Sequence, residues 1–261
     1  MLSRIQCLDQ VYILKSLDES KIRTSSIGLN ELERLRSISI NENPVPWERE
    51  SSSMKRNIKI ASLNCNGLKS HFKDILVDNK LLKADIIHLI ETSLAKNDCQ
   101  QWTIPGYSSH FINVGNGKGI VTYFKSTLFR NDEDISTESM QVTKFTSNEI
   151  DVVNVYRSNT GNSVELLNNI ITMVENPGKA SLITGDFNIC MLNHSKNRMS
   201  KGLEMMGFSQ LIQQATHIKG GHIDHAYWRD REHAWTWPVV ELYSPYYSDH
   251  DALLITLTSG K

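Results

Sequence analysis

The feature that most constrains the fold of this chain is a set of short apolar runs that end in, or are followed by, polar residues. Five such polar clusters occur, at Leu63-Asn64-Cys65-Asn66, Ile90-Glu91-Thr92, Gly185-Asp186-Phe187-Asn188, Ile223-Asp224-His225 and Ser248-Asp249-His250. Short apolar runs are typical of buried strands, so the polar side chains are predicted at strand ends. Strand ends that converge would supply a metal site, a base and anchoring amides, as hydrolysis of a phosphate ester requires.

Length and composition set the outer limits. The 261 residues suit one large domain, or one domain with an appendage, and can bury a sizeable core. The formal net charge of −1 is not that of a typical nucleic-acid binder, but carboxylates at a metal site would offset basic residues elsewhere. The four cysteines form no CxxC pair, which favours a reducing, intracellular compartment. No stretch is long and apolar enough for a signal peptide or a membrane span.

The N-terminal part of the chain has a different character from the rest. Residues 1–37 contain a strand-like run at 11–14 and a short charged helix at 30–36, with no second layer to bury either. Residues 38–57 are predicted to be a linker, because they combine two prolines, dense charge and a serine run. The globular domain is therefore predicted over 58–261.

From Ile58 onward the hydrophobic pattern is regular. Strands are predicted at 58–63, 84–90, 119–124, 150–156, 180–184, 222–228, 239–243 and 252–258, and helices at 68–82, 164–174 and 203–206. Asn162 or Ser163 can cap the second helix. Few, widely spaced helices favour an α/β fold with two packed sheets and helices outside, because a doubly wound sheet needs a helix after nearly every strand.

Asp186 and Asn188 form the most specific polar pair. They are two residues apart, so they share one face of an extended chain while Phe187 points into the core. Gly185 leaves the backbone open to a ligand. We predict that Asp186 positions or deprotonates the attacking water and that Asn188 holds a phosphoryl oxygen.

The remaining carboxylates and amides suggest a cation. Glu91 follows an apolar run, where an unpaired buried carboxylate would cost several kcal/mol. Hard oxygen ligands favour Mg²⁺, with Mn²⁺ as the alternative, so Glu91 is predicted to bind it with help from Asn64 and Asp249. Asn66 is predicted to contact substrate phosphate or to orient a metal-bound water, although an asparagine before Gly67 is also ordinary turn chemistry.

The imidazole of His250 is a candidate base or electrostatic clamp, with Asp224 as its orienting carboxylate. The other histidines are interpreted as structural residues. His222 and His225 are three apart, which on a strand directs them to opposite faces, so a structural zinc site is not expected. Tyr156 could donate a hydroxyl proton and Arg157 could bind phosphate, but a surface Tyr-Arg pair without such a role fits the spacing equally well.

The order of these residues along the chain resembles the exonuclease–endonuclease–phosphatase superfamily over about residues 58–258. The residues that carry the resemblance are Asn64, Glu91, Tyr156, Asp186-Phe187-Asn188, Asp224 and Asp249-His250. The resemblance implies a four-layer, DNase I-like sandwich of two mixed sheets flanked by helices, and Mg²⁺-dependent phosphodiester cleavage. Apurinic endonucleases have an aspartate at the position of Asn66. The asparagine here therefore implies a contact with the substrate and no direct bond to the metal.

Two further segments narrow the resemblance. Ile223-Asp224-His225 and the preceding Ala215-Thr216-His217 are similar to retroelement and apurinic-type DNA endonucleases, which implies a substrate contact for Thr216 and DNA as the partner. A DNA substrate implies a nuclear location. Leu2–Ile5 and Val11–Leu14 resemble the last segment of superfamily-one helicases, although the chain has no Gly-Lys-Ser/Thr phosphate loop. A helicase joined to such an endonuclease resembles the proteins of Helentron-type transposons.

Three functional hypotheses follow. The first is a DNA endonuclease that nicks a strand, derived from a transposon protein with a helicase domain. The second is a phosphatase or RNA deadenylase with the same fold. The third is an interaction module that has lost catalysis, against which the intact polar residues at all five clusters argue.

Overall fold

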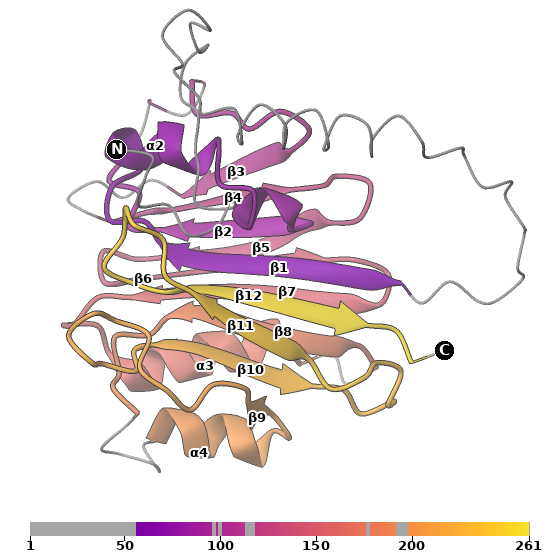
Figure 1. The fold of residues 1–261 in the computed structure, drawn as a ribbon. Coiled ribbons are helices and arrows are strands. Elements are labelled where there is room, and N and C mark those ends of the chain that lie inside the picture. The colour runs from indigo at the N-terminus through magenta and orange to yellow at the C-terminus, as the bar shows by residue number, and fades with distance from the viewer. Residues whose placement is uncertain are drawn as a thin grey trace, which may run out of the picture. The chain divides into compact units, whose positions relative to one another are not determined.

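The computed structural model describes residues 56–260, apart from 96–97, 99–100, 113–117, 176–177 and 192–197. The segment predicted as a helicase remnant, 1–37, and nearly all of the predicted linker, 38–57, lie outside the described residues. Two six-stranded sheets form the described domain (Figure 1). This arrangement confirms the predicted two-sheet α/β class.

The first sheet contains both the beginning and the end of the domain. Its strand order is β11-β12-β1-β2-β4-β3, in which only β1 and β2 are parallel. The strands are β1 (Asn57–Asn64), β2 (Ile86–Ile90), β3 (Ser108–Ile112), β4 (Ile120–Phe124), β11 (Val239–Tyr243) and β12 (Ala252–Thr258).

The second sheet is built from the middle of the chain. Its order is β5-β6-β7-β8-β10-β9, with β7 and β8 parallel and the other pairs antiparallel. The strands are β5 (Arg130–Ser136), β6 (Met140–Thr146), β7 (Ile150–Arg157), β8 (Ala180–Asp186), β9 (Ser209–Gln210) and β10 (Asp224–Arg229). Both sheets are therefore mixed.

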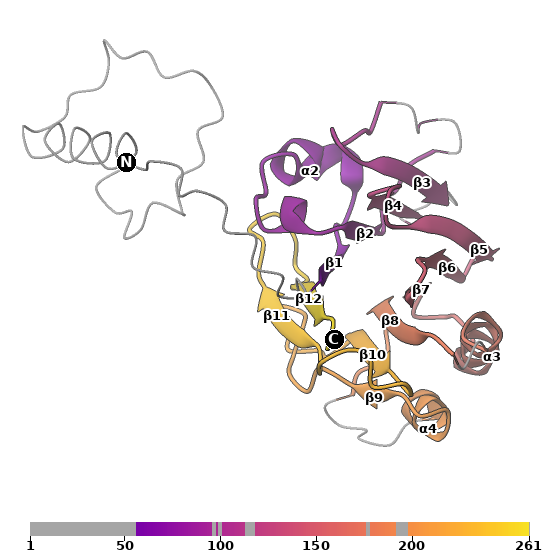
Figure 2. The ribbon, with the colours of Figure 1, turned by 90° about the vertical axis from the view of Figure 1, so that its right-hand side faces the viewer.

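Helices cover the outer faces of the sheets (Figure 2). On the first sheet, α2 (Leu68–Ile75) buries Leu68, Phe72 and Ile75 in a core shared with β1, β2 and β4. On the second sheet, α3 (Ser163–Met173) and α4 (Arg198–Met205) pack against β7 and β8. A separate core between the sheets joins residues of both. The four layers match the predicted sandwich.

The first predicted helix was too long. α2 ends at Ile75, and a short 3₁₀ helix follows at Leu81–Lys83. The physical reason is Asp78, whose Oδ1 accepts the backbone N–H groups of Lys80 and Leu81 at 3.0 and 3.2 Å. A side chain that bonds to the following backbone amides favours a turn over a continuing helix. At α3 the predicted cap is confirmed, because Asn162 accepts the N–H groups of Val164 and Glu165.

The apolar pattern also missed strands β3, β5, β6 and β9. β5 is a largely exposed edge strand of sequence RNDEDIS, so it has no apolar run to detect. β6 has buried polar residues, Gln141 and Thr143, among its apolar ones. None of the helices in the described part of the chain is long and apolar enough to cross a membrane.

Candidate active site

Strand register brings three predicted site residues into one row of the second sheet. Tyr156 on β7 is the partner of Asp186 on β8, and Asp186 is the partner of Asp224 on β10. All three residues are buried. They share the inward-facing side with Val152, Leu182 and Ala226, which belong to the core between the sheets. The row therefore lies at the edge of the sandwich and faces the first sheet.

Asp186 is the centre of an amide cluster. Its Oδ2 accepts the side-chain amide of Asn64 across the sandwich at 2.9 Å and that of Asn188 at 3.2 Å. Its Oδ1 accepts the backbone N–H of Asn188 at 2.9 Å. Three N–H donors fix the plane of this carboxylate. Asp186 and Asn188 do not share one face of an extended chain as predicted, because β8 ends at Asp186 and Asn188 has a φ of 50° in a turn that its own N–H closes on Asp186 Oδ1.

Asp224 and His250 form a buried pair. Nδ1 of His250 lies 2.9 Å from Oδ2 and 3.2 Å from Oδ1 of Asp224. Thr216 donates its hydroxyl proton to Asp224 Oδ2 at 2.7 Å and accepts the backbone N–H of Asp224 at 3.1 Å. One nitrogen of His250 is thus held by a carboxylate, which leaves Nε2 for other partners.

Ser248 connects the His250 loop to the first sheet. Its hydroxyl donates to the backbone carbonyl of Asn64 at 2.7 Å and accepts the backbone N–H of His250 at 3.0 Å. Sequence reasoning included Ser248 in a cluster but gave it no role. Its position directly before Asp249 and His250 was the signal for a turn-forming hydroxyl.

Glu91 follows β2 and hydrogen-bonds to Tyr156. Burial, together with the charges of Glu91 and Asp186, raises the pKa of the Tyr156 hydroxyl well above its usual range. Tyr156 is therefore a neutral hydroxyl that links Glu91 to the Asp186 row. Glu91 has a φ of 56°, an unusual backbone conformation for a residue other than glycine.

Electrostatics separate the two central ionisable groups. Burial, and next the charge of Asp224, raise the pKa of Asp186 to about 7. Burial opposes protonation of His250, but the hydrogen bond and charge of Asp224, aided by Asp186 and Asp249, raise its pKa to about 9. At neutral pH His250 is then an imidazolium, which suits a phosphate clamp better than a base.

Arg157, predicted as a phosphate contact, has a different set of partners. Its Nε donates to the carbonyl of Phe187 at 2.7 Å, and its two terminal nitrogens donate to the carbonyls of Gly161 and Asn188 at 2.5 and 2.7 Å. All three guanidinium nitrogens are thus bound to the backbone of the described chain. This geometry makes Arg157 a brace for the loop that carries Asn188.

Two other predicted substrate contacts lie at different depths. Thr216 is fully buried, and its hydroxyl is engaged with Asp224. Asn66 is exposed, with a φ of 46°, and its backbone N–H donates to Asn64 Oδ1 at 3.1 Å. Thr216 therefore orients a site residue, whereas the side chain of Asn66 is open to a ligand.

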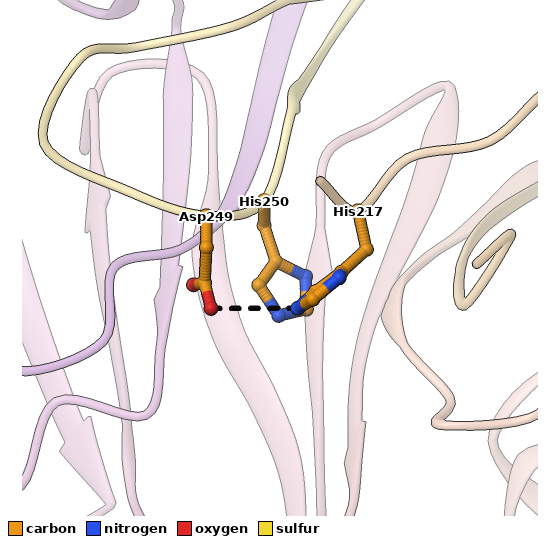
Figure 3. Close-up of side chains that lie close together, drawn as sticks. All are labelled: His217, Asp249 and His250. Carbon is orange, nitrogen blue, oxygen red and sulfur yellow. Dashed lines mark ion pairs between the residues drawn. The ribbon is translucent and has the colours of Figure 1, made fainter. Parts of the chain in front are cut away.

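Three histidines differ from the prediction. His217, interpreted as structural, lies beside Asp249 and His250 (Figure 3): its Nε2 is 3.4 Å from Asp249 Oδ2, and its ring meets that of His250 edge-on at 4.6 Å. The prediction that His222 and His225 face opposite sides of a strand was wrong. β10 begins only at Asp224, and the two rings lie 5.1 Å apart.

The donor set fits a hard divalent cation. Asp186, Asp224 and His250 place carboxylate and ring atoms within 4.8 Å of one another, and so do His217, Asp249 and His250, although an imidazolium at His250 leaves the carboxylates as the ligands. Burial, and next the charge of Asp224, disfavour the ionised form of Asp186 and raise its pKa. A bound cation would favour the ionised form, and oxygen ligands of this kind suit Mg²⁺ or Mn²⁺.

A mixed two-sheet sandwich with acids, amides and a histidine at one edge defines the DNase I-like class of phosphoester hydrolases. Residues 61–250 match the Endonuclease/Exonuclease/phosphatase family. The chain belongs to this family, whose members are hydrolases that act on phosphodiester bonds. A search of reviewed protein sequences gives no match.

Solved structures agree on the fold. The endonuclease domain of TRAS1, a telomere-specific non-LTR retrotransposon, is 15% identical with a TM-score of 0.59, over 79% of this chain and all of that one (100%). D. rerio TDP2 in complex with a single-stranded DNA product is 12% identical with a TM-score of 0.57, and the match covers 77% of this chain and 98% of that one. The human Nocturnin catalytic domain is 16% identical with a TM-score of 0.55, and the match covers 78% of this chain and 97% of that one. Identities this low establish the fold alone.

Proposed function

We propose that this chain is a Mg²⁺-dependent DNA endonuclease that nicks a strand by attack of water on a phosphodiester. The observation that carries the proposal is the continuous set of contacts from Asn64 through Asp186 and Asp224 to His250. These contacts bring a carboxylic acid with a pKa of about 7 (Asp186), an imidazolium and two amides together at one edge of the fold. These are the groups that a phosphoester hydrolase needs to hold a water and neutralise phosphoryl oxygens.

Each residue has a role that its contacts allow. Asp186, with a pKa of about 7, orients the attacking water and accepts its proton. The imidazolium of His250 donates from Nε2 to a non-bridging phosphoryl oxygen, while Asp224 holds its Nδ1. Asn188 donates its amide protons to the carbonyl of Arg157 at 2.8 Å and to Asp186 Oδ2 at 3.2 Å, so its role is to fix the Asp186 carboxylate and not to hold a phosphoryl oxygen.

The metal site of the proposal consists of Glu91, Asn64 and Asp249. A Mg²⁺ ion held there would neutralise the charge that develops on the phosphoryl oxygens. Tyr156 contributes by fixing Glu91 through its hydroxyl. Asn66, exposed at the end of the loop after β1, is placed to contact the substrate backbone.

Relaxation of a supercoiled plasmid tests the proposal. We expect Mg²⁺-dependent nicking that EDTA abolishes, and a loss of at least about 100-fold in both Asp186→Asn and His250→Gln. Glu133→Gln, on the exposed strand β5, and His233→Asn, on an exposed loop, are the matched controls and should retain activity. Undiminished nicking in Asp186→Asn and His250→Gln would reject the site.

A substrate panel separates the alternatives. Poly(A) and inositol phosphates, tested beside the plasmid, distinguish an endonuclease from a deadenylase or a phosphatase of the same fold. Folded protein that turns over none of them in Mg²⁺ or Mn²⁺ would favour the non-catalytic interaction module. The proposed origin in a helicase–endonuclease of a transposable element rests on the resemblance of residues 2–14, and a parent protein with a helicase domain ahead of this chain would support it.

A further inference from the structure

Two adjacent residues before β10 each hold a carboxylate beside His250. Thr216 donates to Asp224 Oδ2 at 2.7 Å, and Nε2 of His217 lies 3.4 Å from Asp249 Oδ2. The Thr216 contact orients Asp224, the carboxylate that holds Nδ1 of His250. The His217 contact concerns a carboxylate that the proposed function assigns to the metal (Figure 3).

The hydrogen bond at Nδ1 determines which tautomer the neutral ring of His217 adopts. The backbone N–H of Lys219 donates to Nδ1 of His217 at 3.0 Å. A ring nitrogen that accepts a hydrogen bond carries no proton, so the single proton of the neutral ring is on Nε2. In that tautomer Nε2 carries the proton, lies 3.4 Å from Asp249 Oδ2 and has no lone pair for a metal. The grouping of His217, Asp249 and His250 is for this reason not a three-ligand metal site.

The backbone fixes the distance between His217 and Asp249. His217 pairs with His250 in an antiparallel bridge, and the N–H of Ile218 donates to the carbonyl of Asp249 at 2.9 Å. The turn that follows is closed by the N–H of Gly220 on the carbonyl of His217 at 2.8 Å, with Gly220 at a φ of 81°. The side chain of His217 is only 12% exposed. Its position thus depends on main-chain contacts more than on a free rotamer.

We propose that His217 is a positioning residue whose Nε2–H restrains the carboxylate of Asp249, which would keep that carboxylate oriented for the divalent cation. This inference rests on the proposed function for the cation, but the contact itself exists without one. Donors behind a metal ligand orient the ligand, and their loss typically lowers metal affinity about 10- to 100-fold. A purely structural histidine would not change metal affinity through Asp249.

Substitutions separate the donor from the ring. His217→Leu removes the Nε2–H and should weaken the binding of Mn²⁺, titrated calorimetrically into the full chain, by about 10-fold. His217→Gln should restore most of that affinity, because its amide N–H can occupy the position of Nε2–H. In an Asp249→Asn background, His217→Leu should change Mn²⁺ affinity less than about two-fold, since the two residues act as one unit. Equal effects of His217→Leu in both backgrounds would overturn the inference.

Nitrogen NMR tests the contact without a metal or a substrate. Under conditions in which the ring is neutral, His217 should show the shifts of the Nε2-protonated tautomer, and Asp249→Asn should shift the Nε2 resonance. A proton on Nδ1, or an Nε2 resonance that ignores Asp249→Asn, would overturn the inference. If wild-type protein binds no Mn²⁺, the proposed metal site fails, and the NMR result decides the role of His217 alone. Thermal unfolding of each variant distinguishes a lost contact from a lost fold.

Discussion

The pair of His250 and Asp224 makes the stability of the protein depend on pH. His250 is buried, and its pKa is raised from 6.5 in a free histidine to about 9, with Asp224 as the main source of the increase. Because the folded pKa is the higher one, the stabilisation is complete below pH 6.5 and is lost as the pH rises through about 9. At roughly 1.4 kcal/mol for each pKa unit, the loss is on the order of 3 kcal/mol.

Urea unfolding in EDTA measures this loss. The free energy of unfolding of wild-type protein should fall by roughly 3 kcal/mol between pH 6 and 10, beyond the change common to all variants. Asp224→Asn keeps the shape of the side chain but removes its charge, so most of this fall should disappear. His250→Gln removes the titrating ring and should flatten the curve in the same way.

Two results would refute the reasoning. The first is an equal pH slope in wild type and Asp224→Asn, which would mean that other groups cause the dependence. The second is an NMR titration that places the pKa of His250 near 6.5. Excess Mg²⁺ offers a further check, because a cation bound at Asp249 would offset a charge that helps to raise the pKa of His250 and should therefore lower that pKa.

Three other perturbations test the fold around the site. Gly185→Ala should lose at least about 2 kcal/mol of stability by urea unfolding, because the added Cβ would lie 2.0 Å from the carbonyl oxygen of Val155 at a φ of 141°. Arg157→Lys should lower the thermal midpoint and the nicking rate together, since one ammonium cannot serve three separated carbonyls. Burial lowers the pKa of His88 to about 3, so the unfolded chain takes up its proton first and the protein should lose stability as the pH falls below about 6.5. A His88→Leu variant should lose this acid sensitivity in circular-dichroism melts.

Sequence pattern predicted the parts of the fold in which apolar residues alternate or cluster. The strands that end at Asn64, Ile90 and Asp186 are all present, because each one is largely buried and rich in apolar residues. β5 and β3 could not be found in the same way, since edge strands pair through the backbone and need few apolar side chains. Pairing partners are a tertiary property that the local pattern does not contain.

Roles of polar residues were harder to predict than their positions. The sequence identified Thr216 and Arg157 as polar residues near the site, but both use their donors on other protein groups. His217 was interpreted as structural together with the other histidines outside the Asp249-His250 cluster, because no pair of them shows zinc-ligand spacing with a cysteine. What distinguishes it is the antiparallel bridge to His250, a contact between residues 33 positions apart, which appears only in three dimensions.

Glu91 shows most clearly what alternation cannot predict. Within β2, Ile86 and Ile90 face the interior between the sheets, while Ile87 and Leu89 face the outer core beneath α2. Continued alternation would place Glu91 on the outer face, away from Asp186. A φ of 56° breaks the alternation and lets the carboxylate reach Tyr156.

Such a conformation costs about 1 kcal/mol or more, so other contacts must maintain it. The loop after β1 provides them: the N–H of Cys65 donates to the carbonyl of Ile90 at 2.9 Å, and the N–H of Gly67 donates to the carbonyl of Glu91 at 2.8 Å. The cluster around Asn64 therefore stabilises the backbone conformation of Glu91, in addition to placing the Asn64 amide on Asp186. Because the turn of one strand end is held by the backbone of the next, the five clusters form one site only when the whole sheet edge is assembled.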